Sequence, residues 1–418
     1  MTKRLLMVTP YVQFVHKAQA EGFWVAAIWD PAQESADYLQ SVREAADAFE
    51  LTDFRDDAGL RKAIRETAHR HGVSSIYHIG REDSMISAFE VAEELGLSLN
   101  PPSAIRLLAD KLAMRERLAQ RNLSTVVFAA AGTRAEVPAA VAGIGAPVVV
   151  KPTSLAGSRG VFLWQSDEDR ATWFEILDAY GYPGPFLVEE YLRGPEYSVE
   201  TLSVDGVHQV VGITQKFLGP PPLFVEVGHL HPAPLPAERR DAIEELTVAF
   251  LDACGYRFGP AHTEVIWTPG GPRIVESQPR LGGDRIPRLV ELSSGFDLER
   301  AIFAALAGRP TSPTPHTGTA LVRFFTLPSG RIDSVHNVES VRLLPYVDEL
   351  ELRVRPGDTV AAVRDSKSRH GHVIVTAQTP PQAVERCTEV LSLVEVVVDG
   401  APAPLDAAPD RITEGTPS

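Results

Sequence analysis

The 418-residue sequence is poor in cysteine and has no long hydrophobic run. Its two cysteines, Cys254 and Cys387, are too few for a disulfide framework or a cysteine-ligated metal site. No stretch approaches the ~18 apolar residues that a membrane span requires. The apolar start is interrupted by Pro10, Gln13 and His16 and has no small-residue cleavage site, which favours a first strand over a signal peptide. We therefore expect a cytoplasmic protein without a membrane anchor.

Basic residues are also outnumbered, with 40 lysines and arginines against 55 acidic residues and a net charge of −15. Nucleic-acid backbones require basic surfaces, so this balance argues against a nucleic-acid partner. It does not exclude a nucleotide substrate, because a local lysine or a metal ion can reverse the sign of the charge inside a cleft. A hydrophobic content of 44% is ordinary for a globular protein, and the length predicts two or three domains.

The first hundred residues alternate strand-like and helix-like segments. Residues 3–10, 23–30 and 73–80 are apolar runs typical of buried strands, and residues 35–50 and 84–97 have helical patterns. This alternation predicts a parallel sheet covered by helices. The motif G-x-G-x-x-G does not follow the first strand, so a dinucleotide site there has no support.

The sequence Asn-Pro-Pro-Ser at 100–103 marks a break, and Ser103 is a candidate N-cap for a helix over 104–122 that carries Lys111. Taken alone, Lys111 is more typical of a solvated helix lysine than of a ligand contact. Residues 147–204 are strand-rich and a helix is predicted over 238–253.

Further along, the strands 262–267 and 273–278 are joined by the turn Thr-Pro-Gly-Gly-Pro. Residues 311–398 alternate short strands and helices and resemble a separate small α/β domain. The tail, residues 399–418, is rich in proline, alanine and acidic residues and is predicted to be disordered.

The predicted hairpin carries a set of polar side chains on one face. Gly270 lies at the centre of the turn, so symmetric pairing places Glu264 opposite Glu276. Two carboxylates facing each other destabilise a sheet unless a cation lies between them, and an all-oxygen site suits Mg²⁺. Strict alternation adds Gln278 and Arg280 to the same face. The alternative is a solvated edge hairpin, but the adaptable Gly-Gly-Asp that follows favours a site.

A second candidate is the stretch KPTSLAGSRG, in which Lys151 ends an apolar run. Lys151 could contact a phosphate, and residues 154–160 could cover phosphates with backbone N–H groups, with Gly157 and Gly160 allowing close approach. This is not a Walker A loop, because the lysine precedes the glycines. Many surface hairpins would match the same pattern.

A third candidate, residues 186–202, has a short apolar strand with Glu189 and Glu190, a bend at Gly-Pro and then Glu196. An adenine requires an apolar slot, backbone partners and an acceptor for its amino group, and a ribose requires a carboxylate for its hydroxyls. This stretch could supply all of them. By itself it is also typical of an amphipathic strand.

Taken together, these motifs resemble the ATP-grasp superfamily. The helix lysine, the strand lysine with its small-residue loop, E-E-Y-L-x-G-x-E and E-x-Q-x-R-x-G-G follow one another in the family's order between about residues 103 and 295. The resemblance implies an α/β protein with an ATP-grasp (α+β) fold. It implies a Rossmann-like parallel-sheet domain before the core (1–102), a two-lobed core (103–310), a small C-terminal α/β domain (311–398) and the tail. Within the core, 103–188 would be the lid lobe and 189–310 the catalytic lobe.

The resemblance also implies roles for the motif residues. Lys111 and Lys151 would hold the ATP phosphates, and Arg280 would face the reacting groups. The other implied cofactor contacts are the lid residues Ser154, Gly157, Ser158 and Gly160, the adenine contacts Glu189, Glu190 and Leu192, and the ribose contact Glu196. Glu264, Glu276 and Gln278 would bind metal. The family usually has Asn where Gln278 stands, so its contact with the metal is the least secure.

Residues 213–235 narrow the resemblance. They are similar to the central strand and loop of bacterial L-amino-acid (dipeptide) ligases, which tend to show F-x-E-x-G-H-x-x-P, and the C-terminal stretch from Arg369 also resembles that branch. Glu226 and His229 become candidates for the amino-acid pocket, with Glu226 able to pair with an α-ammonium group. A core or loop histidine with a satisfied hydrogen bond is the alternative for His229.

The resemblance implies a ligase that uses ATP and Mg²⁺, with two ions and Mn²⁺ as a substitute. It would form an amide between an amino acid carboxylate and an amine, through an acyl phosphate. Its partners would be amino acids as small-molecule substrates, and a homodimer would be unsurprising. The alternatives are an ATP-grasp ligase for another biosynthetic acid and amine, either carrier-bound or of purine type, and a nucleotide-binding regulator without catalysis.

Overall fold

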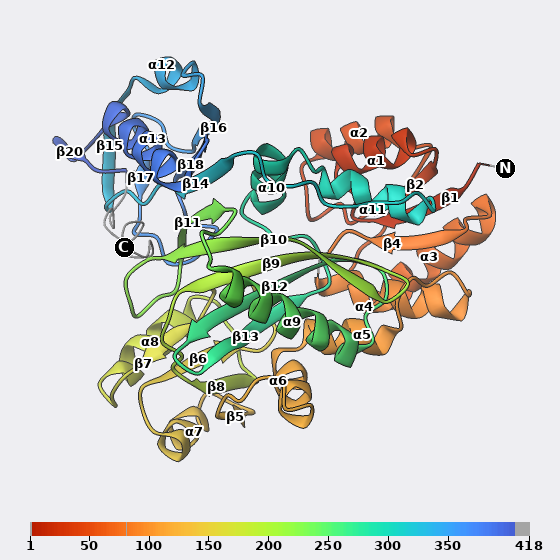
Figure 1. Cartoon of the computed structure of the whole chain (residues 1–418), viewed down its shortest axis with the longest axis horizontal. Coiled ribbons are helices and arrows are strands. Elements are labelled where there is room, and N and C mark those ends of the chain that lie inside the picture. Colours follow the sequence, from red (N-terminus) through yellow and green to blue (C-terminus); the bar gives the residue numbers. More distant parts are fainter. Residues whose placement is uncertain (1, 81, 406–418) are drawn as a thin grey trace.

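A computed structural model of the chain describes residues 2–80 and 82–405 (Figure 1). Its strands form four sheets, and the helices cover them. No helix among these residues is long and apolar enough to cross a membrane. Residues 406–418 lie outside the described residues, and for them the prediction of a disordered tail stays a prediction.

The N-terminal sheet is parallel and has the strand order β3-β2-β1-β4. Strands β1 and β2 are almost continuously buried, as expected for central parallel strands covered on both faces. The elements are β1 (Arg4–Val8), α1 (Val12–Ala20), β2 (Trp24–Trp29), α2 (Ala36–Ala45), β3 (Ala48–Leu51), α3 (Asp57–His71), β4 (Ser75–His78) and α4 (Glu82–Glu94). The parallel-sheet prediction for this region is confirmed.

One predicted helix in this domain is too long. The helical pattern over 35–50 covers α2 and also strand β3, which pairs with β2. Asp47 ends the helix register, because its backbone N–H bonds to the carbonyl of Val25 and its carboxylate accepts from the N–H of Val25. A four-residue edge strand is too short to show a clear alternation of apolar and polar residues, so the sequence does not distinguish it from the end of the preceding helix.

The predicted single helix over 104–122 is two helices, α5 (Pro102–Ala109) and α6 (Lys111–Gln120). Asp110 is extended, with φ −114° and ψ 111°, and its carboxylate accepts from the N–H groups of Leu112 and Ala113. Ser103 is not the N-cap of α5, because Pro102 takes the first helical position, where its missing N–H is not needed. The break makes Lys111 the first residue of α6.

The lid lobe is a four-stranded sheet in the order β5-β8-β6-β7, packed around Trp164, Trp173 and Phe186. Its elements are β5 (Phe128–Ala131), α7 (Val137–Ile144), β6 (Val148–Pro152), β7 (Phe162–Trp164), α8 (Asp169–Asp178) and β8 (Phe186–Glu190). Lys151 lies near the end of the fully buried strand β6, and the loop 154–160 connects β6 to β7.

The central sheet has eight strands in the order β13-β12-β9-β10-β11-β14-β18-β16. The elements up to residue 306 are β9 (Glu196–Val204), β10 (Val207–Leu218), β11 (Glu226–His231), α9 (Ala237–Cys254), β12 (Gly259–Thr268), β13 (Gly271–Gln278), α10 (Ile286–Ser294) and α11 (Leu298–Leu306). Helix α9 and the β12–β13 hairpin are confirmed. In Figure 1 the green strands β9, β10, β12 and β13 of this sheet lie between the yellow lid lobe and the red and blue parts of the chain.

The C-terminal part is not a separate sheet, because β14 pairs with β11 and continues the central sheet through β18 to β16. A second small sheet, β17-β15-β19-β20, packs beside it. The elements are β14 (Thr319–Phe324), β15 (Gly330–His336), α12 (Val338–Arg342), β16 (Val347–Leu352), β17 (Thr359–Val360), β18 (Gly371–Ala377), α13 (Pro380–Leu393), β19 (Glu395–Val398) and β20 (Ala401–Ala403). Strand β20 lies in the segment predicted to be disordered, so for 399–405 that prediction is wrong.

The contribution of the N-cap Asp110, which begins α6 at Lys111, can be tested by mutation. Replacing Asp110 by Ala removes the acceptor for two N–H groups and should lower the free energy of unfolding by about 1 kcal/mol, whereas Asn at this position retains a capping oxygen. Denaturant unfolding of D110A and D110N measures the difference. Equal stabilities of the two variants would show that the cap contributes nothing.

Candidate active site

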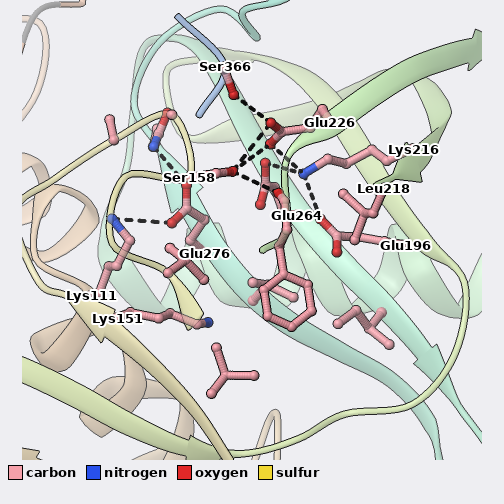
Figure 2. A pocket seen from close by; sticks show the side chains of 18 of the residues that line it. Lys111, Lys151, Ser158, Glu196, Lys216, Leu218, Glu226, Glu264, Glu276 and Ser366 are labelled. Carbon is pink, nitrogen blue, oxygen red and sulfur yellow. Dashed lines mark hydrogen bonds and ion pairs between the residues drawn. The ribbon is translucent and has the colours of Figure 1, made fainter. Parts of the chain in front are cut away.

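A pocket lies between the lid lobe and the central sheet, and its wall brings together residues that are far apart in the sequence (Figure 2). The predicted residues that line it are Lys111, Lys151, Gly157, Ser158, Glu189, Glu190, Leu192, Glu196, Glu226, His229, Glu264, Glu276, Gln278 and Arg280. Two predicted cofactor contacts are outside this lining. Ser154 donates its hydroxyl to Tyr182 Oη at 3.2 Å, and Gly160, at φ +72°, packs against Pro152 and Leu177.

Lys151 is held by a buried carboxylate. Its Nζ lies 2.5 Å from Glu189 Oε2, and the other oxygen of Glu189 accepts from Arg115 Nε at 2.5 Å. Burial alone would raise the pKa of Glu189, but the two cations outweigh it and lower the pKa. Both oxygens of Glu189 are therefore engaged by cations, so the expected adenine acceptor serves here as the counter-charge of Lys151.

Arg115, which the sequence did not single out, also contacts the acidic hairpin. This buried side chain donates to the carbonyls of Ile274 (2.9 Å) and Val275 (3.4 Å). Val275 is the extra residue of a β-bulge between β12 and β13. A basic residue one helical turn after Lys111 was the available signal, because positions i and i+4 share a helix face.

Glu264 and Glu276 are register partners, as predicted, but for a different reason. The turn pairs Thr268 with Gly271, and an unbroken ladder from that pair would place Val275 opposite Glu264. The bulge at Val275 shifts the register by one residue and brings Glu276 into position. Register in a hairpin depends on such local irregularities, which the symmetry of the sequence about Gly270 did not reveal.

Glu276 is connected to both the helix lysine and the loop. Lys111 Nζ lies 3.3 Å from Glu276 Oε2 and donates to the carbonyl of Leu155 at 3.0 Å. Gln278 donates its amide Nε2 to Glu276 Oε1 at 2.9 Å. Figure 2 shows Lys111 reaching Glu276 from the side of the loop.

Lys216 is the main residue that the sequence analysis missed. Its Nζ lies 2.5 Å from Glu196 Oε1, 2.6 Å from Glu264 Oε1 and 3.6 Å from Glu226 Oε1 (Figure 2). Burial would lower the pKa of Lys216, but the three carboxylates raise it well above its ordinary value. The local signal was weak, because Lys216 stands in Ile-Thr-Gln-Lys-Phe-Leu, which lacks the valine run that precedes Lys151.

The protonation of the cluster around Lys216 follows from these distances. Burial raises the pKa of Glu196, and the charges of Glu264 and Glu226 add to that effect. Burial would also raise the pKa of Glu264, but Lys216 and His262 lower it strongly. Glu264 is therefore an ionised carboxylate between two cations, whereas Glu196 binds a proton more readily than an isolated glutamate does.

His262 forms the far side of the same cluster. Its Nδ1 lies 2.6 Å from Glu200 Oε1, and its Nε2 lies 3.4 Å from Glu264 Oε1. Burial would lower the pKa of His262, but these carboxylates raise it to about 10, so the imidazolium form is present at neutral pH.

The loop 154–160 is fastened across the pocket by Glu226. Ser158 Oγ donates to the carbonyl of Phe224 at 2.9 Å and lies 3.3 Å from the Glu226 carboxylate. Ser366, from the segment before β18, donates to Glu226 Oε2 at 2.6 Å, and its backbone N–H bonds to the carbonyl of Gly157 at 3.3 Å. Glu226 thus joins the loop to the C-terminal part of the chain.

His229 is a buried residue beside Asp284. Its Nε2 lies 3.3 Å from Asp284 Oδ2, and its Nδ1 has no hydrogen-bond partner among the residues the structure describes. Arg369 binds the two oxygens of Asp284 and stacks over Phe324 at 3.6 Å from the ring centre. Burial would raise the pKa of Asp284, but Arg369 and His229 lower it.

The donor set of the hairpin fits a hard divalent cation. Glu264, Glu276 and Gln278 offer only oxygen ligands on adjacent strands, and protein cations compensate each carboxylate where it stands. A bound metal ion could take over this compensation, and Lys111 could then contact substrate phosphates.

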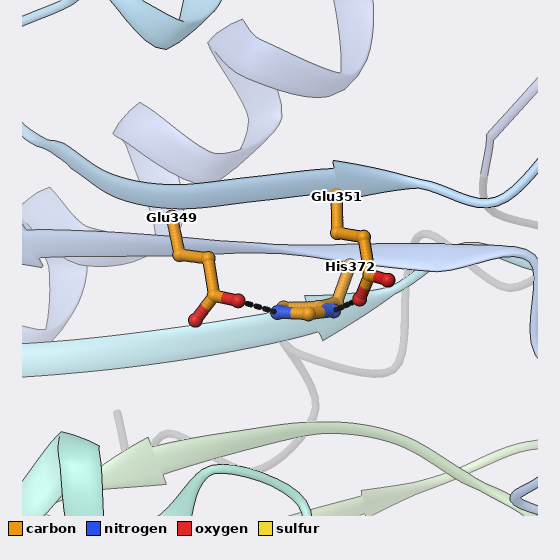
Figure 3. Close-up of side chains that lie close together, drawn as sticks. All are labelled: Glu349, Glu351 and His372. Carbon is orange, nitrogen blue, oxygen red and sulfur yellow. Dashed lines mark ion pairs between the residues drawn. The ribbon is translucent and has the colours of Figure 1, made fainter. Parts of the chain in front are cut away.

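A tighter cluster of possible ligands, Glu349, Glu351 and His372, lies in the C-terminal part (Figure 3). The imidazole lies between the carboxylates, with Nε2 3.3 Å from Glu349 and Nδ1 3.4 Å from Glu351. Arg285 and Arg353 pair with the same glutamates at 2.7 and 3.0 Å. One ion cannot use both ring nitrogens, and the charges are already balanced, so this cluster is an ion-pair network.

Comparison with known proteins supports the motif analysis. Residues 144–288 match the ATP-grasp domain family, and residues 323–399 match the L-amino acid ligase C-terminal domain 2. Uncharacterized protein y4rH of Sinorhizobium fredii is 28% identical over 388 residues, 91% of this chain and 79% of that protein. Dapdiamide A synthase of Enterobacter agglomerans is 26% identical over 302 residues, 67% of this chain and 70% of that protein.

The fold agrees with a solved structure. The crystal structure of an L-amino acid ligase from Bacillus licheniformis superposes with a TM-score of 0.78 at 21% identity, covering 95% of this chain and 99% of that one. Amino acid ligases of Bacillus subtilis are also among the relatives. The predicted ATP-grasp fold, the resemblance to L-amino acid ligases and the expectation of an ATP-dependent carbon–nitrogen ligase are confirmed.

His262 makes the stability of the cluster pH dependent. A pKa raised from 6.5 to about 10 means that its stabilising contribution is complete below pH 6.5 and is lost as the pH rises toward 10. H262Q should therefore lower the free energy of unfolding below pH 6.5 and flatten its decline from there to pH 10.

Urea unfolding from pH 6 to 10 measures this effect. The control is His336→Gln, which changes an exposed histidine of β15. If H262Q and wild type show parallel pH profiles, His262 is not an imidazolium in the folded protein.

Proposed function

We propose that this chain, an ATP-grasp ligase with the C-terminal domain of L-amino acid ligases, joins the carboxylate of one amino acid to the amino group of another at the expense of ATP. The observation that carries the proposal is a single pocket containing the lysines Lys111 and Lys151, the facing carboxylates Glu264 and Glu276, and Arg280, under a loop rich in small residues.

The lysines would contact the phosphates of ATP. Each ammonium group has three donors. The contacts of Lys151 with Glu189, and of Lys111 with Glu276 and the carbonyl of Leu155, leave at least one donor on each lysine for phosphate oxygens. The adenine would lie against the backbone at 190–192, since Glu189 is occupied by Lys151 and Arg115. Glu196 would face the ribose, although it also accepts from Lys216.

Glu264, Glu276 and Gln278 would hold Mg²⁺. A divalent ion bound there would neutralise charge on the phosphate oxygens during transfer. Lys216 would keep Glu264 ionised and in place when no ion is bound, because its Nζ lies 2.6 Å from that carboxylate.

In the first half-reaction, an oxygen of the acid's carboxylate forms a bond to the γ-phosphorus, and the bond from phosphorus to the ADP oxygen breaks. Acyl phosphate and ADP result. Arg280, at the wall shared by the acid and the phosphate, would stabilise the charge that develops on both. The chain contributes mainly by positioning the reactants and by excluding water.

In the second half-reaction, the amine nitrogen attacks the acyl carbon, inorganic phosphate leaves, and the ammonium protons pass to phosphate and solvent. Glu226 would hold the incoming ammonium group, and His229 would line the same pocket. Closure of the loop 154–160 would protect the acyl phosphate, and the contacts of Ser158 with Phe224 and Glu226 show how the loop is fastened.

The test is release of phosphate by purified protein with Mg²⁺-ATP over a matrix of amino-acid pairs, with mass spectrometry of the products. We expect release that requires two amino acids and a product equal in mass to their sum less water. Release with an acid alone would favour a different amine. No release with any pair would favour a carrier-bound or other biosynthetic acid, or a silent nucleotide binder, over the proposed reaction.

The acidic hairpin has its own test. Replacing Glu276 by Ala removes one of two facing carboxylates, so the Mg²⁺ concentration for half-maximal activity should rise by at least about tenfold, as expected for a lost metal ligand or its direct partner. Glu245→Ala, on the exposed face of α9, is the control. An unchanged Mg²⁺ titration in E276A would remove the hairpin from the metal site.

A further inference from the structure

A second chamber adjoins the active-site pocket and has a strongly basic wall. It is lined by residues of the loop 154–160, of the segment 280–288 and of the C-terminal segment 353–372. Tyr11 and Phe14, from the N-terminal part of the chain, also line it. The two cavities share Ala156, Gly157, Arg280, Gly283 and Asp284 in their walls. We call it the basic chamber. A molecule in it would lie directly beside the position where the acyl group is activated.

The charge of the basic chamber contrasts with the charge of the protein. Among the residues that the structure describes, seven arginine and lysine side chains line it and only two acidic ones, Asp284 and Glu299. The whole chain carries a net charge of −15. A concave surface with charge of one sign concentrates ligands of the opposite sign, so the wall favours an anion.

Three of the six arginines in the wall pair with carboxylates that lie outside it. Arg285 pairs with Glu349 at 2.7 Å, and Arg288 pairs with Asp348 at 2.6 Å. Glu349 and Asp348 do not line the chamber. These pairs hold the guanidinium groups in position without placing a carboxylate on the side of the wall that faces the chamber. Glu299, one of the two acids that do line it, is already paired with Lys17 at 2.9 Å.

Two basic side chains of the wall differ from the rest. Arg159 and Lys367 form no ion pair with a carboxylate anywhere in the described ranges, 2–80 and 82–405. Arg159 donates its Nε to the carbonyl of Ala156 at 2.9 Å, which leaves the terminal guanidinium nitrogens available. Asp365, the acid nearest to Lys367 in the chain, accepts from the Tyr180 hydroxyl and from backbone N–H groups.

Their positions connect these cations to closure of the site. Arg159 lies on the loop that Ser158 fastens to Glu226, and Lys367 follows Ser366, which binds the same carboxylate. With Ser158 and Ser366 both bound to Glu226, Arg159 and Lys367 both line the basic chamber. Two cations in one chamber without carboxylate partners among the described residues suit a ligand with two carboxylates.

We propose that the basic chamber binds the amine substrate, and that this substrate is an amino acid with an acidic side chain. The inference rests on the proposed ligase function. The acid substrate must place its carboxylate at the phosphate in the main pocket, so the adjoining chamber is the space left for the amine. Arg159 and Lys367 bind the two carboxylates of the amine, and its amino group points past Asp284, where the two cavities meet, toward Glu226 in the main pocket.

The test compares isosteric amines that differ in charge. With a fixed acid substrate, kcat/KM for glutamate as the amine should exceed that for glutamine at least tenfold, and aspartate should exceed asparagine in the same way. R159Q and K367Q should each reduce these ratios several-fold, without changing KM for ATP. The matched control is Arg364→Gln, which removes the same charge from an exposed position of the same segment outside the chamber wall.

A binding measurement keeps the inference testable without turnover. Calorimetric titration of glutamate and glutamine into protein saturated with Mg²⁺ and a non-hydrolysable ATP analogue should show glutamate binding that R159Q weakens. Equal kcat/KM or equal binding of the two amines to wild type overturns the inference while phosphate release still supports the ligase. Charge preference that persists in R159Q and K367Q overturns the assignment to these residues.

Discussion

The buried ammonium group of Lys216 is the constraint on which the arrangement of the site depends. It lies among Glu196, Glu226 and Glu264, which come from three different strands, and its own strand β10 runs between them. Three carboxylates so close together would repel one another in a site of low dielectric. The single buried cation attracts all three and so stabilises their close approach. Because each carboxylate has a different proposed partner, one lysine positions the ribose, amine and metal regions relative to one another.

A second buried charge connects the lid lobe to the same sheet. Arg115 binds Glu189, which in turn binds Lys151, and it also contacts the bulge at Val275. The strand lysine and the register of the acidic hairpin are therefore held by one guanidinium group. Removing one partner of such a network leaves an uncompensated buried charge, which is more costly than the network itself is stabilising. The polar groups of the site are thus tied to the fold as well as to chemistry.

The C-terminal part of the chain contributes residues to the site. Its strands β14, β18 and β16 extend the central sheet, and Ser366 and Arg369 reach the pocket from it. The match of residues 323–399 to a domain of L-amino acid ligases thus concerns a segment that contacts the loop 154–160 directly. This continuity explains why the boundary near residue 310, predicted from the alternation of short strands and helices, does not coincide with a break in the sheet.

The sequence by itself determined the type of most elements and the identity of most charged pocket residues, because apolar periodicity and short motifs are local properties. The facing of Glu264 and Glu276 was predicted correctly, yet the bulge that produces it was not. Only the tertiary structure decided which charges meet. The sequence identified neither Lys216, whose carboxylate partners lie on three other strands, nor Arg115. Electrostatic partners are chosen by distance and burial, and strands distant in sequence become neighbours only when the sheet is complete.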